Sequence, residues 1–422
     1  MDPSMTTSDS APTRVYVWVW LPGSTQPVPA GVIEQSGDVA YFNYGRSYLE
    51  REDSIALYLP ELPLQSGRIR PLQGLTIAGC LSDAGPDAWG RRVIRYRMWG
   101  TAELNTKDDE LTELTYLLES GSDRIGAIDF QSSPEEYVPR TSEATLAEMQ
   151  EAAERLEKGV PLSSELEMAL LHGSAIGGAR PKALLQHGAR SLIAKFSSTT
   201  DSYPVVKAEG LAMELARRVG LDVARTEVVE SLGRDVLLVE RFDRTSIPGQ
   251  RRSIVSALTL LELDETFARY ATYYDLVPII QERFRDARQT MRELFSRIVF
   301  NICVGNTDDH ARNHAAFWDG TSLSLTPAFD ICPQQRSGGE AVQAMAIAPG
   351  FRYSQLAGCI KASEIYFLSH VEARRIVDEQ LDIIQSQWTD ASDAARLSEN
   401  ERRQLWRRQF LNPYVTEGLE VL

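Results

Sequence analysis

A polar stretch around residue 310 combines the side-chain types that phosphoryl transfer requires. Residues 305–314 read Gly-Asn-Thr-Asp-Asp-His-Ala-Arg-Asn-His, and a further Asp stands at position 330. Protein kinases use one carboxylate to orient or deprotonate the acceptor hydroxyl, and an Asn with a separate Asp to hold Mg²⁺ on the nucleotide phosphates. The spacing here follows that general pattern. We therefore predict Asp308 as the catalytic carboxylate, with Asn313 and Asp330 as Mg²⁺ ligands.

Two other interpretations of this stretch remain open. Asp, Asn and Gly commonly fill turns by bonding their own backbone, without any catalytic role. Alternatively, His310 and His314, four residues apart, would form a hydrolytic metal site with Asp308 if the stretch were helical. No Glu follows His310 to act as the base of the zincin motif, which disfavours the metal site.

The elements around this stretch are predicted to bring its side chains together. Apolar residues at helical spacing predict a helix leading up to Gly305, which should end it: Met291, Leu294, Phe295, Ile298, Val299 and Ile302. Short strands are expected at 315–318 and 323–325, with a turn between them. Such a hairpin would return Asp330 toward Asp308 and Asn313.

A second informative stretch covers residues 172–196. Gly177 and Gly178 lie in a loop before two apolar segments joined at His187-Gly188, and glycines let backbone amides approach a phosphate closely. The loop is not a Walker A motif, because Ala-Arg follows Gly178. Lys195 lies in the second apolar segment, where a buried ammonium needs an anion. A nucleotide phosphate would supply one; an edge strand with Lys195 in solvent is the alternative.

The next elements extend this pattern. An apolar helical stripe from Val206 to Val219 places Glu209 on its inner face, which makes Glu209 the predicted partner of Lys195. A strand at 236–239 then passes into residues 240–244, where a kinase hinge would bind adenine through backbone groups. Glycine loop, lysine strand, glutamate helix, hinge, Asp308, Asn313 and Asp330 thus follow one another in kinase order.

Composition indicates in which compartment the protein works and which partners it lacks. The 422 residues carry a net charge of −15, which argues against unaided binding to nucleic acid. The four cysteines form no close pair, as expected for a reducing compartment. Residues 1–12 lack the apolar core of a signal peptide, and no apolar run is long enough to span a membrane. We expect a cytoplasmic protein without a membrane partner.

The chain is expected to divide into three parts. Strands predicted at 14–21, 31–35, 40–44 and 55–59, followed by a helix toward Trp99, form a β-rich N-terminal subdomain over 13–139. Residues 140–245 would be the nucleotide-binding N-lobe, and 246–422 a helical catalytic C-lobe. Helices are also predicted at 369–387 and 398–409.

Five segments together resemble the HipA family of toxin serine/threonine kinases. They are Gly-Gly-Ala-Arg-Pro-Lys (177–182), Ile-Ala-Lys-Phe (193–196), Val-Glu-Arg-Phe-Asp-Arg (239–244), Gly-Asn-Thr-Asp-Asp-His-Ala-Arg-Asn (305–313) and Thr-Pro-Ala-Phe-Asp-Ile (326–331). Asp-Ala-Trp-Gly-Arg (87–91) and the N-terminal β-rich part also match that family. The resemblance covers nearly the whole chain.

The resemblance implies an α+β, two-lobed kinase fold related to phosphatidylinositol 3/4-kinases, using ATP and Mg²⁺. Lys195 would contact the ATP phosphates, Glu240 and Phe242 would lie at the adenine hinge, and Asp308 would be the catalytic base. Asn313 and Asp330 would hold Mg²⁺. The other expected nucleotide-binding residues are Gly177, Gly178, Ala179, Lys182, Glu209 and His310.

The family also implies partners. Members phosphorylate a protein substrate, often an aminoacyl-tRNA synthetase, and so arrest growth; a small helix-turn-helix antitoxin neutralises them and carries the DNA binding. Many are switched off by autophosphorylation of a Ser just before the Gly-Gly-Ala segment. Here Ala175 stands at that place and Ser174 precedes it. We hypothesise that Ser174 takes this role.

Three alternatives to a toxin kinase remain. One is a catalytically weak, nucleotide-binding co-repressor that acts with the antitoxin, and another is a small-molecule or lipid kinase on the same fold. The third is the metal hydrolase described above. Lys195, Asp308, Asn313 and Asp330 are all present, which disfavours a degenerate kinase.

Overall fold

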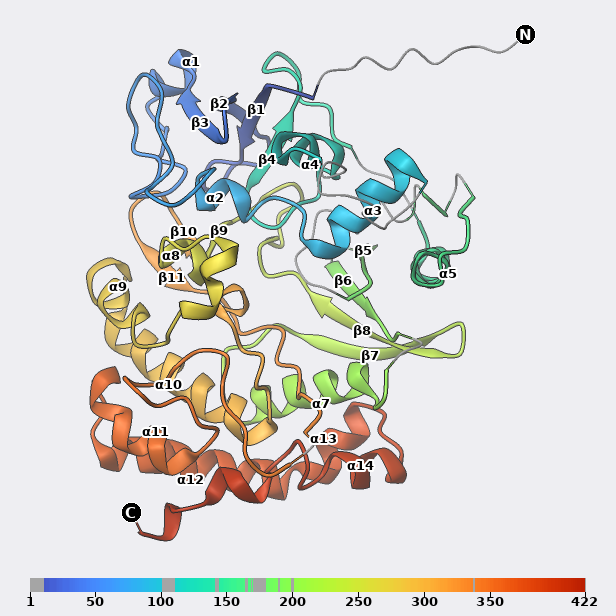
Figure 1. Ribbon diagram of the computed structural model, residues 1–422, viewed down its shortest axis with the longest axis vertical. Helices are drawn as coiled ribbons and strands as arrows, with labels where there is room; N and C mark the ends of the chain where they lie inside the picture. The colour runs from blue at the N-terminus through green and yellow to red at the C-terminus, as the bar shows by residue number, and fades with distance from the viewer. Residues whose placement is uncertain are drawn as a thin grey trace.

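The computed structural model describes residues 11–100, 111–140, 144–163, 166–167, 169, 180–188, 190–198, 201–336 and 338–421. Figure 1 shows the N-terminal subdomain at one end of the long axis and a row of C-terminal helices at the other, with the N-lobe sheet between them. The fold is mixed α+β with two lobes and an additional N-terminal subdomain, as the sequence predicts.

The N-terminal subdomain is built on an antiparallel sheet in the order β3-β2-β1-β4. Alternating buried positions along its strands face a core shared with the helices that follow. Its elements are β1 (Arg14–Val19), β2 (Val28–Ser36), β3 (Val39–Tyr44), β4 (Ile128–Gln131), α1 (Arg46–Leu49), α2 (Gly79–Ser82), α3 (Ala88–Trp99) and α4 (Glu113–Glu119).

The prediction of a strand at 55–59 is wrong. Residues 55–59 take part only in an isolated bridge between Tyr58 and Leu62. Tyrosine hydroxyls bond this backbone instead of a neighbouring strand: Tyr48 donates to the Ile55 carbonyl at 2.9 Å, and the Leu57 amide donates to Tyr44 at 2.9 Å. Buried backbone groups need partners, and here side chains provide them.

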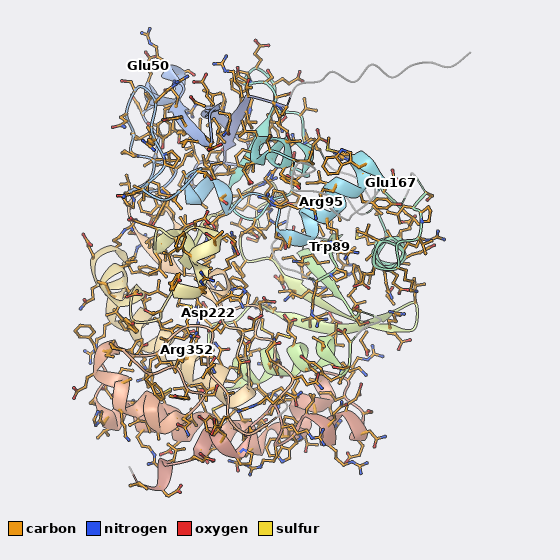
Figure 2. All side chains as sticks on the ribbon, in the orientation of Figure 1. Glu50, Trp89, Arg95, Glu167, Asp222 and Arg352 are labelled. Atoms are coloured by element: carbon orange, nitrogen blue, oxygen red, sulfur yellow. The ribbon has the colours of Figure 1, made fainter. Side chains whose placement is uncertain are left out.

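The N-lobe is an antiparallel sheet covered on both faces. The sheet runs β5-β6-β8-β7, with β5 (Lys182–His187), β6 (Arg190–Phe196), β7 (Thr226–Ser231) and β8 (Arg234–Glu240). Helix α7 (Val205–Arg218) packs on one face, and α3 and α5 (Leu146–Glu157) pack on the other. Figure 2 shows Trp89 of α3 at this second face, where it shares a cluster with Ala194 and Phe196.

The C-lobe surrounds one buried helix, α10 (Ala287–Val304), which ends before Gly305 as predicted. Gly305 ends it with φ of 71°, a left-handed conformation that favours glycine. The predicted hairpin is also present, as β10 (Ala315–Trp318) and β11 (Leu323–Leu325), and β9 (Ser253–Ser256) joins it on the other side of β10. The C-lobe helices are α8 (Ala257–Leu260), α9 (Leu276–Arg283), α11 (Leu356–Ala362), α12 (His370–Ser386), α13 (Trp388–Ala394) and α14 (Glu399–Leu405).

Short 3₁₀ helices complete the described chain: η2 (Glu265–Tyr270), η3 (Ala311–Asn313), η4 (Ser363–Tyr366), η5 (Pro413–Thr416) and η6 (Leu419–Val421). The helices predicted at 369–387 and 398–409 correspond to α12 and α14, each opened by a Ser-x-x-Glu capping box. Helix α14 stops at Leu405 because Trp406 is extended and Arg407 has φ of 60°. Within the described ranges, no helix is long and apolar enough to cross a membrane.

Candidate active site

Lys195 lies at the centre of the candidate site, between the N-lobe sheet and the C-lobe. It belongs to β6, and its side chain is on the face covered by α7. Lys195 Nζ lies 2.5 Å from Glu209 Oε1 and also donates to Asp330 Oδ1. The predicted ion pair with Glu209 is therefore present, and one ammonium joins a carboxylate of each lobe.

Lys195, Glu209 and Asp330 shift one another's pKa values. Burial lowers the pKa of Lys195, but the Asp330 and Glu209 carboxylates outweigh it and raise this pKa above its ordinary value. Burial raises the pKa of Glu209, and the attraction of Lys195 does not fully offset it. For Asp330 the attraction of Lys195 does outweigh burial, so its pKa is lowered. Lys195 thus keeps its charge while Asp330 stays ionised.

Asp330 is fixed by the segment that precedes it. Ala328 exchanges backbone hydrogen bonds with residues 222–224: its amide donates to the Asp222 carbonyl at 2.7 Å, and its carbonyl accepts from the Ala224 amide at 2.9 Å. Asp222, labelled in Figure 2, lies in the connection between α7 and β7. Asp330 itself has φ of 59°, which costs a non-glycine residue about 1 kcal/mol. Such strain persists where the surrounding structure enforces it, and it is common at functional sites.

Asp308 and Asn313 lie on the loop between α10 and β10. Asn313 is buried, and its Nδ2 donates to the Asp308 carbonyl at 3.4 Å. The Asp308 side chain is exposed. Partial desolvation raises the pKa of Asp308, His310 opposes this, and the Asp330 carboxylate raises it further. The hairpin therefore brings Asp330 into electrostatic range of Asp308, as the sequence predicts, and also of His310.

Asp309 is a positioning residue that sequence reasoning missed. The residue is 3% exposed, and Oδ2 accepts from Asn301 Nδ2 at 2.7 Å and Tyr273 Oη at 2.5 Å. His314 Nε2 lies 2.8 Å from the same oxygen. Burial raises the pKa of Asp309, but His314 and the hydrogen bond from Tyr273 outweigh it and lower the pKa. The network fixes the loop from inside while Asp308 faces outward.

This network also removes the basis of the metal-hydrolase interpretation. That interpretation requires residues 308–314 to be helical, whereas they form a loop with the single 3₁₀ turn η3. His314 is buried against Asp309 instead of facing Asp308 and His310. In the part of the chain that the structure describes, no group of three or more His, Cys, Asp and Glu side chains could hold a metal ion.

The predicted hinge follows β8. Glu240 is the last residue of that strand, and Phe242 packs edge-on against Phe317, with ring centroids 5.9 Å apart. Arg241 and Asp243, on either side of Phe242, instead bond residues of the N-terminal subdomain. Arg241, buried, bonds Asp243 Oδ2 at 2.7 Å and Asp123 Oδ1 at 2.9 Å, so the hinge is anchored to the N-terminal subdomain.

Lys182 opens β5 directly opposite Lys195. Its side chain is 3% exposed, and its Nζ lies 2.9 Å from Asp87 Oδ2. The charges of Lys195 and Asp330 both act on it, so Lys182 belongs to the same site. The other predicted loop residues, Ser174, Gly177, Gly178 and Ala179, lie outside the described residues.

Comparison with known proteins agrees with this arrangement. The model of the HipA-like C-terminal domain matches residues 174–388, about half of the chain, and the model of the HipA N-terminal domain matches residues 19–131. A curated relative, the serine/threonine-protein kinase toxin HipA of Shewanella oneidensis, is 26% identical over 184 residues. That alignment covers 37% of this chain and 42% of the relative, so the match spans less than half of the relative's length.

A solved structure shares the fold over nearly the full length. It is the complex of HipA, HipB and operator DNA from Shewanella oneidensis, with a TM-score of 0.65 and 19% identity. The match covers 94% of this chain and 99% of that one. With both domain models matched in order, and with Lys195, Asp308 and Asp330 converging in the C-terminal match, this chain belongs to the HipA family.

Proposed function

We propose that this protein is an ATP-dependent protein serine/threonine kinase and the toxin of a toxin–antitoxin pair. The observation that carries the proposal is the contact of Lys195 with both Glu209 and Asp330, within electrostatic range of Asp308. A charged lysine held by a glutamate is how kinases position nucleotide phosphates, and a nearby exposed carboxylate can take the proton of an acceptor hydroxyl. The S. oneidensis relative is named as a kinase of this specificity.

In this proposal each residue has one task. Glu209 holds Lys195 in place, and Lys195 binds phosphate oxygens of ATP. Asp308 orients the Ser or Thr hydroxyl of the substrate and accepts its proton, which its raised pKa favours. Phe242 and the Glu240 end of β8 would border the adenine, and His310, which acts to lower the pKa of both Asp308 and Asp330, would lie beside the transferred phosphoryl group.

The donor set suits Mg²⁺. The Asp330 carboxylate raises the pKa of Asp308, which places the two carboxylates within electrostatic range, and Asn313 lies on the same loop as Asp308. Magnesium prefers one or two carboxylates together with phosphate oxygens and water, which Asp330, the Asn313 amide oxygen and ATP would provide. When bound, it would neutralise charge on the phosphates.

We further propose the partners. A small helix-turn-helix antitoxin, like the HipB in the S. oneidensis complex, would bind this chain and carry the DNA contact. The net charge of −15 is consistent with DNA binding only through that partner. The phosphorylated protein would belong to the translation machinery of the host cytoplasm, with an aminoacyl-tRNA synthetase as the first candidate, and Ser174 would be the site of autophosphorylation.

The test is transfer of labelled γ-phosphate from ATP in a bacterial lysate, with and without Mg²⁺. The wild type should label a host protein only with Mg²⁺, and Asp308→Asn should not, whereas Asp38→Asn, at an exposed aspartate of the N-terminal subdomain, should behave like the wild type. ATP binding without transfer to any protein would instead favour the co-repressor or small-molecule kinase. Phosphosite mapping of the wild type in the same reaction shows whether Ser174 is modified.

A further inference from the structure

Asp87 and Lys182 form a buried ion pair between the N-terminal subdomain and the N-lobe. Lys182 Nζ lies 2.9 Å from Asp87 Oδ2, and their side chains are 3% and 14% exposed. The residues are 95 positions apart in sequence. A buried ammonium needs an anionic partner to keep its charge, and Asp87 is such a partner.

Lys182 faces the nucleotide site. It lies directly opposite Lys195 on the neighbouring strand, and residues paired in this way project from the same face of a sheet. Burial lowers the pKa of Lys182, the Asp87 carboxylate opposes this, Lys195 lowers it further and Asp330 raises it. Two lysines thus point toward the region where Asp330 meets Lys195, one held by Glu209 and the other by Asp87.

Asp87 is itself rigidly held. Its Oδ1 accepts from the Gly90 amide at 2.8 Å and so caps the N-terminus of α3. The helix itself is anchored to the N-lobe, because Trp89 and Val93 pack in one cluster with Ala194 and Phe196 of β6. The carboxylate therefore cannot move relative to β5 and β6 without disturbing this packing.

The other end of the same loop is attached to the C-lobe. Asp83 accepts from the Ser256 amide at 2.7 Å, from Ser256 Oγ at 2.7 Å and from Thr259 Oγ1 at 2.8 Å. Residues 83–87 therefore connect the two lobes on the N-terminal subdomain's side of the site. This connection fixes Asp87, and with it Lys182, relative to the lobe that carries Asp308.

We propose that Asp87 is a positioning residue for nucleotide binding: it orients the Lys182 ammonium toward the phosphates of ATP, so that the N-terminal subdomain completes the nucleotide site. An ammonium has three N–H donors, so Lys182 can bond Asp87 and a phosphate oxygen together. The proposal rests on the ATP binding of the proposed function, and it does not depend on whether the phosphoryl group is then transferred.

The test uses two substitutions that keep the helix cap. Asp87→Asn removes the charge and Asp87→Ser also shortens the side chain out of reach of Lys182, and both Asn and Ser cap helices about as well as Asp. Calorimetric titration of the full-length protein with ATP and Mg²⁺ should show about tenfold weaker binding for Asp87→Ser, the scale of one charged hydrogen bond. Lys182→Met should show a similar loss, and the double variant should lose no more than Lys182→Met alone.

Adenosine separates positioning from folding. It lacks phosphates, so its affinity should stay unchanged in Asp87→Ser, and Asp53→Asn, at an exposed aspartate of the same subdomain, should leave both affinities unchanged. Unaltered ATP affinity in Asp87→Ser would overturn the proposal. So would an equal loss for ATP and adenosine, because Asp87 would then act only on the fold. A wild type that binds ATP without transferring phosphate would refute the kinase function alone, and one that does not bind ATP would refute both.

Discussion

Asp309 Oδ2 and His314 Nε2 lie 2.8 Å apart inside the C-lobe, while the side chain of the preceding residue, Asp308, is exposed to solvent. Two consecutive aspartates thus have opposite environments. The buried one is surrounded by donors and holds the loop in position, and the exposed one is left with a raised pKa. Substitutions at these two neighbouring residues can therefore be compared directly.

Asp309→Ala and Asp308→Asn should separate stability from phosphate transfer. Asp309→Ala leaves Tyr273, Asn301 and His314 without their shared partner, and we expect a loss of about 3 kcal/mol in the free energy of unfolding. Asp308→Asn should leave this free energy unchanged and reduce phosphate transfer about a hundredfold or more. Urea unfolding and the transfer assay measure the two effects. Equal destabilisation by both substitutions would contradict this division.

Arg241 should contribute strongly to stability. Its guanidinium is fully buried and bonds Asp243, Asp123 and the Arg124 carbonyl across the contact with the N-terminal subdomain. Arg241→Met leaves buried carboxylates with fewer partners, and we expect unfolding to require about 3–5 kcal/mol less free energy. Arg46→Ala removes the exposed pair with Glu50 and should cost about 0.5 kcal/mol or less. If urea unfolding showed comparable losses of unfolding free energy for the two variants, the buried network would contribute no more to stability than the exposed pair.

Gly305 should tolerate no side chain. A Cβ at this residue would lie 2.6 Å from the Gln409 carbonyl oxygen, in addition to the strain of its positive φ. We expect Gly305→Ala to destabilise the protein by about 3 kcal/mol, combining the conformational and steric costs. Gly350 also has a positive φ, but a Cβ there would contact no described atom within 4 Å, so Gly350→Ala should cost about 1 kcal/mol. The difference between the two variants in thermal unfolding measures the cost of the clash with Gln409, because both variants share the cost of a positive φ.

Glu61 should make stability depend on pH. Its side chain is 2% exposed, and burial raises its pKa from about 4.5 to about 7, although the Gly79 and Cys80 amides donate to it. Between these two values the folded state binds more protons than the unfolded state, so the contribution of Glu61 to stability falls as pH rises. It is fully present below the unfolded pKa and is lost above the folded one.

Glu61→Gln should remove this dependence. From about pH 5 to about pH 8, the free energy of unfolding of the wild type should fall by about 2 kcal/mol relative to that of the variant. Urea unfolding of both proteins across this range measures the difference, in which the titration of other groups cancels. If the difference in unfolding free energy between the two proteins were constant with pH, or grew in favour of the wild type, Glu61 would not have a raised pKa in the folded state.

The sequence by itself determined the local elements around the site. Apolar spacing predicted α10 and Gly305 predicted its end, and the same reasoning placed Glu209 on the inner face of α7, where it meets Lys195. The hairpin of β10 and β11 was likewise predictable. Helical periodicity, strand alternation and glycine's backbone freedom act over a few residues, so the order of residues alone contains them.

Only the tertiary structure decided which polar residues bind each other across the chain. Arg241 reaches Asp123, 118 positions away, and Lys182 reaches Asp87. At residues 55–59 a strand-like composition did not form a strand, because the hydroxyls of Tyr44 and Tyr48 bond the backbone there. Asp308 and Asp309 have the same side chain, and only the packing around the loop exposes one and buries the other. Partner choice and burial depend on which elements pack together, and a local pattern does not contain that information.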